Sequence, residues 1–114
     1  MTRKDIQRDW LYALDWVRKH GYEICEQCFR SIDFVMWDRK RDEMVFVKVK
    51  VHTKPRVVSR IVWANRLKRN LFRKQCNEWR RINRWRGRYR CDVIEVFPYI
   101  KGTPCLDHIL DVKM

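Results

Sequence analysis

The segment 45–51, VFVKVKV, constrains the fold more than any other part of the chain, because its side chains alternate with a period of two. In an extended strand its four valines share one face, which is expected to lie in a core. The opposite face carries Phe46, Lys48, Lys50 and His52. Two interpretations of that face are open: an edge strand whose lysine stems reach solvent, or a functional site built around the two lysines.

The rest of the chain alternates between helical and strand patterns. Apolar spacing predicts a first helix over 5–19, closed by Gly21, and one long or two consecutive helices over about 57–85. Strand patterns occur at 22–29, at 31–38, from 44 onward and at 89–100. The segment 106–114 fits either a short helix or an edge strand. This order predicts one α/β domain over 1–114, a sandwich with a central mixed sheet of about four strands flanked by helices.

The charge balance indicates the class of partner. The 114 residues include 27 Lys and Arg against 14 Asp and Glu, a formal net charge of +13. Such a charge favours polyanions, either nucleic acids or anionic membrane surfaces, with binding that weakens as salt increases. The N-terminus is charged, and no apolar run has the length of a signal peptide or a membrane span. We therefore expect a cytoplasmic protein.

Five cysteines, an odd number without a secretion signal, favour reduced thiols over a disulfide framework. One alternative is a zinc site, because Cys25 and Cys28 near the start and Cys105 and His108 near the end have ligand-like spacing.

Asp33 is the only acid in the strand pattern before the turn at 38–42. An antiparallel register centred near Lys40 places Asp33 opposite Lys48, so Asp33, Lys48 and Lys50 are expected to share one surface. An acid on one strand and an acid-x-Lys on the next is a constellation of metal-dependent nucleases. The carboxylates hold Mg²⁺, which activates the attacking water, and the lysine stabilises the developing negative charge.

The segments HGYEICEQCFRSIDFVMWDRKRDEMVFVKVK, RCDVIEV and DHILDVKM resemble, in order and spacing, the YraN family of small restriction-endonuclease-like proteins. The resemblance implies a nuclease-like α/β sandwich and the catalytic pattern Asp, Glu-x-Lys. Asp33 matches the Asp and Lys50 matches the Lys, but Lys48 stands where the family has its metal-binding Glu. The first-helix Glu of the family falls near Trp10, with Asp9 as a neighbour.

These replacements predict a site with lost or severely weakened metal-dependent cleavage, because a divalent ion needs oxygen ligands and an ammonium group repels it. No cofactor is expected. Mg²⁺ or Mn²⁺, with Asp33 as a ligand, is expected only if the protein is an active endonuclease. In that alternative the missing acid is Asp9, Glu23 or Glu26. Lys48 either contacts phosphate directly or forms an ion pair with Asp33 or Glu43.

The segment 65–91 carries the strongest binding signal, a run of basic residues with Glu78 as its sole acid. The predicted nucleic-acid contacts are Lys48, Arg66, Arg69, Arg73, Arg80, Arg81, Arg84, Arg86 and Arg88. Arginine suits bidentate phosphate contacts. Trp85 and Tyr89 can stack on unpaired bases, and Trp79 is expected in the core. The leading hypothesis is a nucleic-acid-binding protein with DNA as its partner; the other alternative is a basic adaptor for an acidic protein or a membrane surface.

Overall fold

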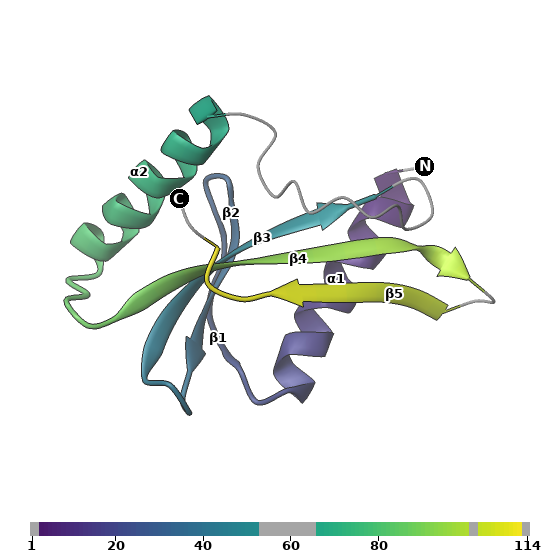
Figure 1. Ribbon diagram of the computed structural model, residues 1–114, viewed down its shortest axis with the longest axis horizontal. Helices are drawn as coiled ribbons and strands as arrows, with labels where there is room; N and C mark the ends of the chain where they lie inside the picture. Colours follow the sequence, from purple (N-terminus) through teal and green to yellow (C-terminus); the bar gives the residue numbers. More distant parts are fainter. Residues whose placement is uncertain (1–2, 53–65, 101–102, 113–114) are drawn as a thin grey trace.

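The computed structural model describes residues 3–52, 66–100 and 103–112, which form a five-stranded sheet with a helix on each face (Figure 1). The elements are α1 (Arg3–Lys19), β1 (Glu23–Phe29), β2 (Ile32–Asp38), β3 (Glu43–Val51), α2 (Arg66–Ile82), β4 (Tyr89–Ile100) and β5 (Thr103–Ile109). The strands follow the order β1-β2-β3-β4-β5, in which only β3 and β4 run parallel. The expected nuclease-like α/β sandwich with a mixed sheet is confirmed.

Two details differ from the sequence-based expectation. The sheet has a fifth strand, because the C-terminal segment pairs with β4 as an edge strand instead of forming a helix. The second helix begins at Arg66, and the earlier part of the range predicted for it, 57–65, lies outside the described residues.

β3 is the central strand, so the edge-strand interpretation of its lysine face is wrong. Its valine face is buried against α1, as predicted, and Val45 and Val47 are fully buried. Its other face is also covered at the start of the strand, where Phe46 is fully buried beneath α2. The lysines follow at 48 and 50, where the strand is only partly buried. They therefore stand at the margin of a covered face.

α1 packs Ala13, Leu14 and Val17 against the valine face. Its end is fixed by Gly21, which has a φ of +87°. The amide of Gly21 donates to Arg18 O at 3.2 Å, and the next amide, that of residue 22, donates to Val17 O at 3.0 Å. These two bonds form a Schellman motif, which confirms the predicted glycine cap.

α2 packs on the opposite face of the sheet through residues spaced at i, i+4 and i+7. Phe72, Cys76 and Trp79 are buried there, and Trp79 meets Phe46 edge to face with ring centroids 5.5 Å apart. The core position of Trp79 is confirmed. Among the apolar residues whose spacing predicted the helix, the three that the structure describes are exposed, with exposed fractions of 80% for Leu67, 51% for Leu71 and 57% for Ile82. The apolar spacing therefore predicted the helix correctly but did not predict which of its faces is buried.

A buried ionic cluster joins β2, β3, β4 and β5 around Arg90. The guanidinium donates to Asp92 Oδ1 at 2.9 Å, to Asp38 Oδ2 at 2.7 Å and to Glu43 Oε1 at 3.3 Å. His108 Nε2 lies 2.7 Å from Asp92 Oδ2. Burial alone would raise the pKa of Asp92, but its hydrogen bonds with His108 and Arg90 bring that pKa below its ordinary value. The cluster therefore contributes most to the stability of the fold when Asp38 and Asp92 are both ionised.

The zinc alternative is excluded by topology. Cys25 and Cys28 belong to β1, and Cys105 and His108 belong to β5, at the opposite edge of the sheet. His108 is also engaged by the buried ionic cluster. All five cysteines are free thiols.

Candidate functional site

Asp33 stands where the ladder between β2 and β3 ends. The last paired residues are Phe34 and Val47, so Asp33 lies opposite Lys48, in the register predicted from the turn. On β3, two residues after Val47, the amide of Val49 donates to Asp33 Oδ2 at 2.6 Å. The carboxylate therefore continues the ladder by accepting a backbone hydrogen bond from β3.

Two more donors reach the same carboxylate. Trp10 on α1 donates its indole N–H to Asp33 Oδ1 at 3.2 Å, and Lys48 Nζ lies 3.7 Å from Asp33 Oδ2. Burial raises the pKa of Asp33, although the contacts with Val49, Lys48 and Trp10 act in the opposite direction. A helix and a strand thus direct three donor groups at a single acid.

This donor set does not fit a resident divalent cation. Mg²⁺ and Mn²⁺ bind carboxylate, carbonyl and water oxygens, usually with one or two carboxylates in the set. Here Trp10 and Lys48 present N–H groups to Asp33, where the resemblance to the YraN family implies acids. Among the residues that the structure describes, no group of three or more His, Cys, Asp or Glu side chains is arranged to hold a metal.

Of its two expected ion-pair partners, Asp33 and Glu43, Lys48 contacts Asp33. It approaches Asp33, and its ammonium also lies 3.4 Å from Ser31 O, whereas Glu43 is engaged by Arg90 in the buried ionic cluster. The Lys48 side chain is 33% exposed, so solvent reaches part of it.

Lys50 lies beside Glu95, its partner across the parallel pair β3–β4. Burial lowers the pKa of Lys50; the nearby Glu95 raises it, and the charges of Lys48 and Lys68 lower it further. Glu95 is only 4% exposed, and its Oε2 lies 3.8 Å from Nε2 of His52. Cationic and anionic groups therefore alternate across the end of β3.

Sequence reasoning missed Glu95 as a site residue. Its signal was available, because Glu95 is the only acid within the apolar stretch 93–97, just as Asp33 is the only acid in its strand pattern. The parallel register between β3 and β4, which brings Glu95 next to Lys50, cannot be read from either segment alone.

Two of the three acids considered as a missing metal ligand have partners away from Asp33. Glu23 pairs with Arg39 at 3.1 Å and is 63% exposed, and Glu26 accepts from Trp79 Nε1 at 2.9 Å. Asp9 is 1% exposed; its Oδ1 lies 3.5 Å from Nε of Arg8, and neither oxygen accepts a hydrogen bond from a described residue.

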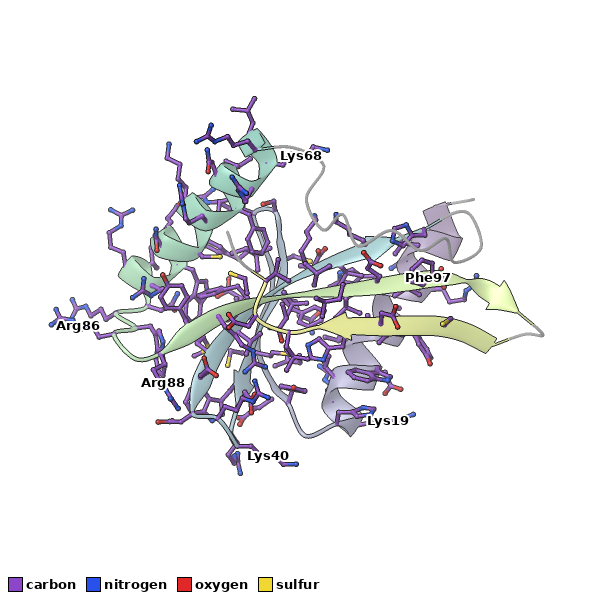
Figure 2. The ribbon with its side chains drawn as sticks, in the orientation of Figure 1. Lys19, Lys40, Lys68, Arg86, Arg88 and Phe97 are labelled. Atoms are coloured by element: carbon purple, nitrogen blue, oxygen red, sulfur yellow. The ribbon has the colours of Figure 1, made fainter. Side chains whose placement is uncertain are left out.

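The basic residues of α2 and of the turn to β4 form a surface that we call the arginine surface. Its members are Arg66, Arg69, Arg73, Arg80, Arg81, Arg84, Arg86 and Arg88; Arg69 and Arg80 are half-buried and the other six are exposed. Figure 2 shows Arg86 and Arg88 projecting at the end of α2 opposite Lys68. The first five members lie on α2, and Arg84, Arg86 and Arg88 lie beyond its end.

Acids do not neutralise the arginine surface within the described part of the chain. None of its members has an ion pair with a carboxylate. Glu78, the sole acid of α2, is bound instead by Arg30 from the β1–β2 turn. Arg73 and Arg80 donate to the amide oxygens of Asn70 and Asn77, each at 3.2 Å. These amides orient the guanidinium groups and leave their charge intact.

Neither of the described helices has the length and apolar composition needed to cross a bilayer. Comparison with curated proteins found no match. Comparison with protein families matched residues 11–96, which include Asp33, the lysines of β3 and the whole arginine surface, and begin one residue after Trp10. The chain therefore belongs to the uncharacterised protein family UPF0102, the YraN family of nuclease-like proteins that its sequence resembles.

Proposed function

We propose that this chain binds nucleic acid, with DNA as its partner, through a nuclease-like fold that has lost or severely weakened metal-dependent cleavage. The observation that carries the proposal is the arginine surface, whose members have no carboxylate partner among the described residues. Guanidinium groups that lack acidic partners bind phosphate oxygens and release counterions from the nucleic acid, which drives association.

The environment of Asp33 supports the loss of cleavage. Its carboxylate accepts from the Val49 amide and the Trp10 indole and lies beside the Lys48 ammonium. A cation that entered would have to displace these donors and approach an ammonium group. Lys48 instead suits direct contact with a phosphate, because its side chain is partly exposed and phosphate carries the opposite charge.

The test of binding is fluorescence anisotropy of labelled duplex DNA across a salt series. We expect affinity to fall steeply with salt, with a slope of about −0.9 for each phosphate contacted. Replacing Arg80, Arg81 and Arg84 by alanine should weaken binding equally across sequences and make the slope shallower by about 1 for each phosphate that the variant no longer binds. Arg39→Ala is the matched control, because Arg39 is 79% exposed, lies on the β2–β3 turn and is paired with Glu23. Equal losses in Arg39→Ala and in the triple variant would contradict a localised surface.

One observation favours an active metal-dependent nuclease as the second candidate. Glu95 is a buried carboxylate beside Lys50, on the strand next to the one that carries Lys48. Incubation of plasmid and branched DNA with Mn²⁺ separates the two candidates. The proposed function predicts shifted but intact DNA. Nicking that requires Mn²⁺ and disappears in both Asp33→Ala and Glu95→Gln would establish the second candidate instead.

A further inference from the structure

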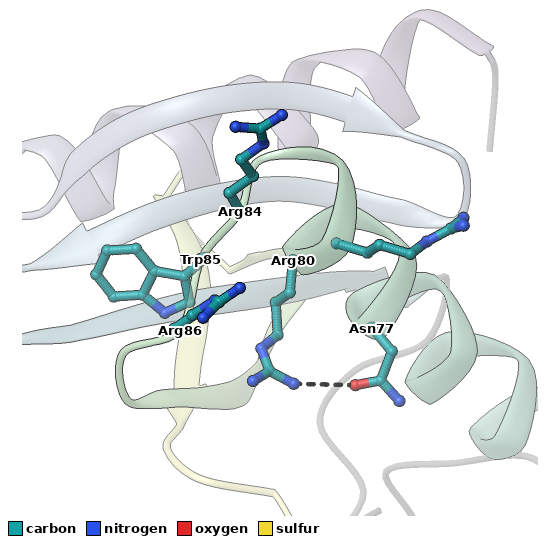
Figure 3. Close-up of a pocket in the computed structure, with 6 residues that line it drawn as sticks. Asn77, Arg80, Arg84, Trp85 and Arg86 are labelled. Atoms are coloured by element: carbon teal, nitrogen blue, oxygen red, sulfur yellow. Dashed lines mark hydrogen bonds between the residues drawn. The ribbon is translucent and has the colours of Figure 1, made fainter.

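The C-terminal end of α2 and the turn to β4 enclose an open pocket of about 320 Å³ (Figure 3). Its lining consists of Asn77, Arg80, Arg81, Arg84, Trp85 and Arg86. Pockets for small molecules are mostly apolar with a few polar groups, whereas this one has four arginines and a single aromatic ring. The composition suits a ligand that combines an anionic group with a flat ring.

The backbone of this turn holds an arginine where a glycine is usual. The Arg84 amide donates to Arg81 O at 3.3 Å and the Trp85 amide to Arg80 O at 2.8 Å, which forms a Schellman motif with Arg84 at the left-handed position. The φ of Arg84 is +54°, and this conformation costs a non-glycine residue about 1–2 kcal/mol. Local strain of this kind is typical of functional sites, where the side chain is needed.

Trp85 is fixed before any ligand arrives. Its indole N–H donates to Arg88 O at 3.1 Å, and its ring meets Trp37 edge to face at 5.5 Å. The ring also lies against Gly87, where an added Cβ would stand only 2.6 Å from Cζ2 of the tryptophan. A ring held in this way is suited to stack on a base of any sequence, because every base has a π face.

Tyr89, the other aromatic residue expected to stack on bases, is 39% exposed, but Arg80 already stacks on its ring. The Arg80 guanidinium lies 3.9 Å from the centroid of its ring, and Phe46 contacts it edge to face at 6.0 Å. Arg80 Nε is buried and has no hydrogen-bond partner among the described residues. The stack and the bond to Asn77 hold Arg80 in the wall of the pocket, with a donor that no protein group satisfies.

We propose that this pocket holds one unpaired nucleotide of the bound nucleic acid, with its base against Trp85 and its phosphate bound by one of the arginines that line the pocket. The inference rests on the proposed nucleic-acid binding and adds a preference for strands with unpaired nucleotides. A base inside a duplex is already stacked on both faces and reaches Trp85 only after it leaves the stack.

The test compares a labelled single strand of thymidines with a blunt duplex of the same length. We expect Trp85→Ala to weaken single-strand binding by about 5- to 150-fold, the range for loss of one stacked base, and duplex binding by less than about twofold. Trp85→Phe is the control that keeps a ring. Gly87→Ala should reproduce the selective loss without removing any arginine, because its methyl group displaces the indole.

A competition measurement on the unaltered chain is independent of how the variants fold. Thymidine monophosphate should displace the single strand at concentrations that leave the duplex bound, and inorganic phosphate at equal ionic strength should not. Equal weakening of both DNA forms by Trp85→Ala, or competition by phosphate alone as effective as by the nucleotide, would overturn the pocket assignment and leave the arginine surface in place. Absence of binding to either DNA form would overturn the proposed function itself.

Discussion

The charge at position 48 decides whether Asp33 is surrounded by donors or forms part of a metal site, and Lys48→Glu tests this directly. Lys48 Nζ lies 3.7 Å from Asp33 Oδ2, and the two side chains are 33% and 22% exposed. Unit charges at about 4 Å interact by about 1 kcal/mol in water and about 4 kcal/mol at an effective dielectric constant of about 20. Replacing this attraction by an equal repulsion changes the energy by twice that amount, so the metal-free variant should be destabilised by about 2–8 kcal/mol at neutral pH.

The pH dependence of that loss follows from the pKa of Asp33, which burial already raises and Lys48 lowers. Removing the ammonium raises the pKa further. Because a raised pKa stabilises the protonated folded state, the loss should shrink as the pH falls through that pKa. At constant pH, a divalent ion should also reduce the loss of stability in the variant. Asp33 and the new carboxylate at position 48 together form a better ligand set than Asp33 alone. Free Mn²⁺ at about 100 times its dissociation constant adds about 2.7 kcal/mol.

The assay is urea unfolding of the variant with and without Mn²⁺, with Lys48→Gln as the matched control. Glutamine removes the positive charge without adding a carboxylate, so its stability should not depend on Mn²⁺. The unaltered protein should also be indifferent to Mn²⁺. Equal stabilisation of all three chains by Mn²⁺, or none in Lys48→Glu, would refute the conclusion that the charge at this position controls metal binding.

Three further substitutions test the fold and the pocket. Arg84→Gly should stabilise the protein by about 1 kcal/mol by relieving its left-handed backbone, and should also weaken nucleic-acid binding; thermal unfolding and anisotropy measure the two effects. Asp92→Asn should cost about 3–5 kcal/mol at neutral pH by leaving buried Arg90 under-compensated. The folded pKa of Asp92 lies below its ordinary value of 3.8, so this difference should narrow as unfolding is measured from about pH 5 toward pH 2. Phe72→Ala should cost about 3–5 kcal/mol, but Leu67→Ala less than about 0.5 kcal/mol, in denaturant titrations.

Local patterns predicted much of the site because its register depends on a short turn. The four-residue loop between β2 and β3 fixes how far each strand extends, so Asp33 falls opposite Lys48 with no information from the rest of the chain. Gly21 likewise marked the end of α1, because the left-handed position of the cap favours glycine. In both cases the determining interactions lie within a few residues in sequence.

The features that the sequence did not reveal depend on packing between distant elements. Leu67 and Leu71 continue an apolar repeat as well as Phe72 does, and only the docking of α2 on the sheet determines which stripe is buried. The same limit applies to Glu95. It approaches Lys50 because β4 runs parallel to β3, and α2 separates these two strands in sequence.

Trp10 and Lys48 change the chemistry around Asp33 in the same direction, although they lie on different elements. In the resemblance to the YraN family, Lys48 stands at the metal-binding Glu and Trp10 lies near the first-helix Glu, acids that would share a cation with Asp33; here both side chains present hydrogen atoms to it. The two replacements are mutually consistent, since a carboxylate without a cation needs donors to offset its burial. Asp33 has a structural role with or without a cation, because it accepts a hydrogen bond from the Val49 amide where the β2–β3 ladder ends. An aspartate at this position is therefore compatible with the loss of cleavage, and its presence alone does not identify a nuclease.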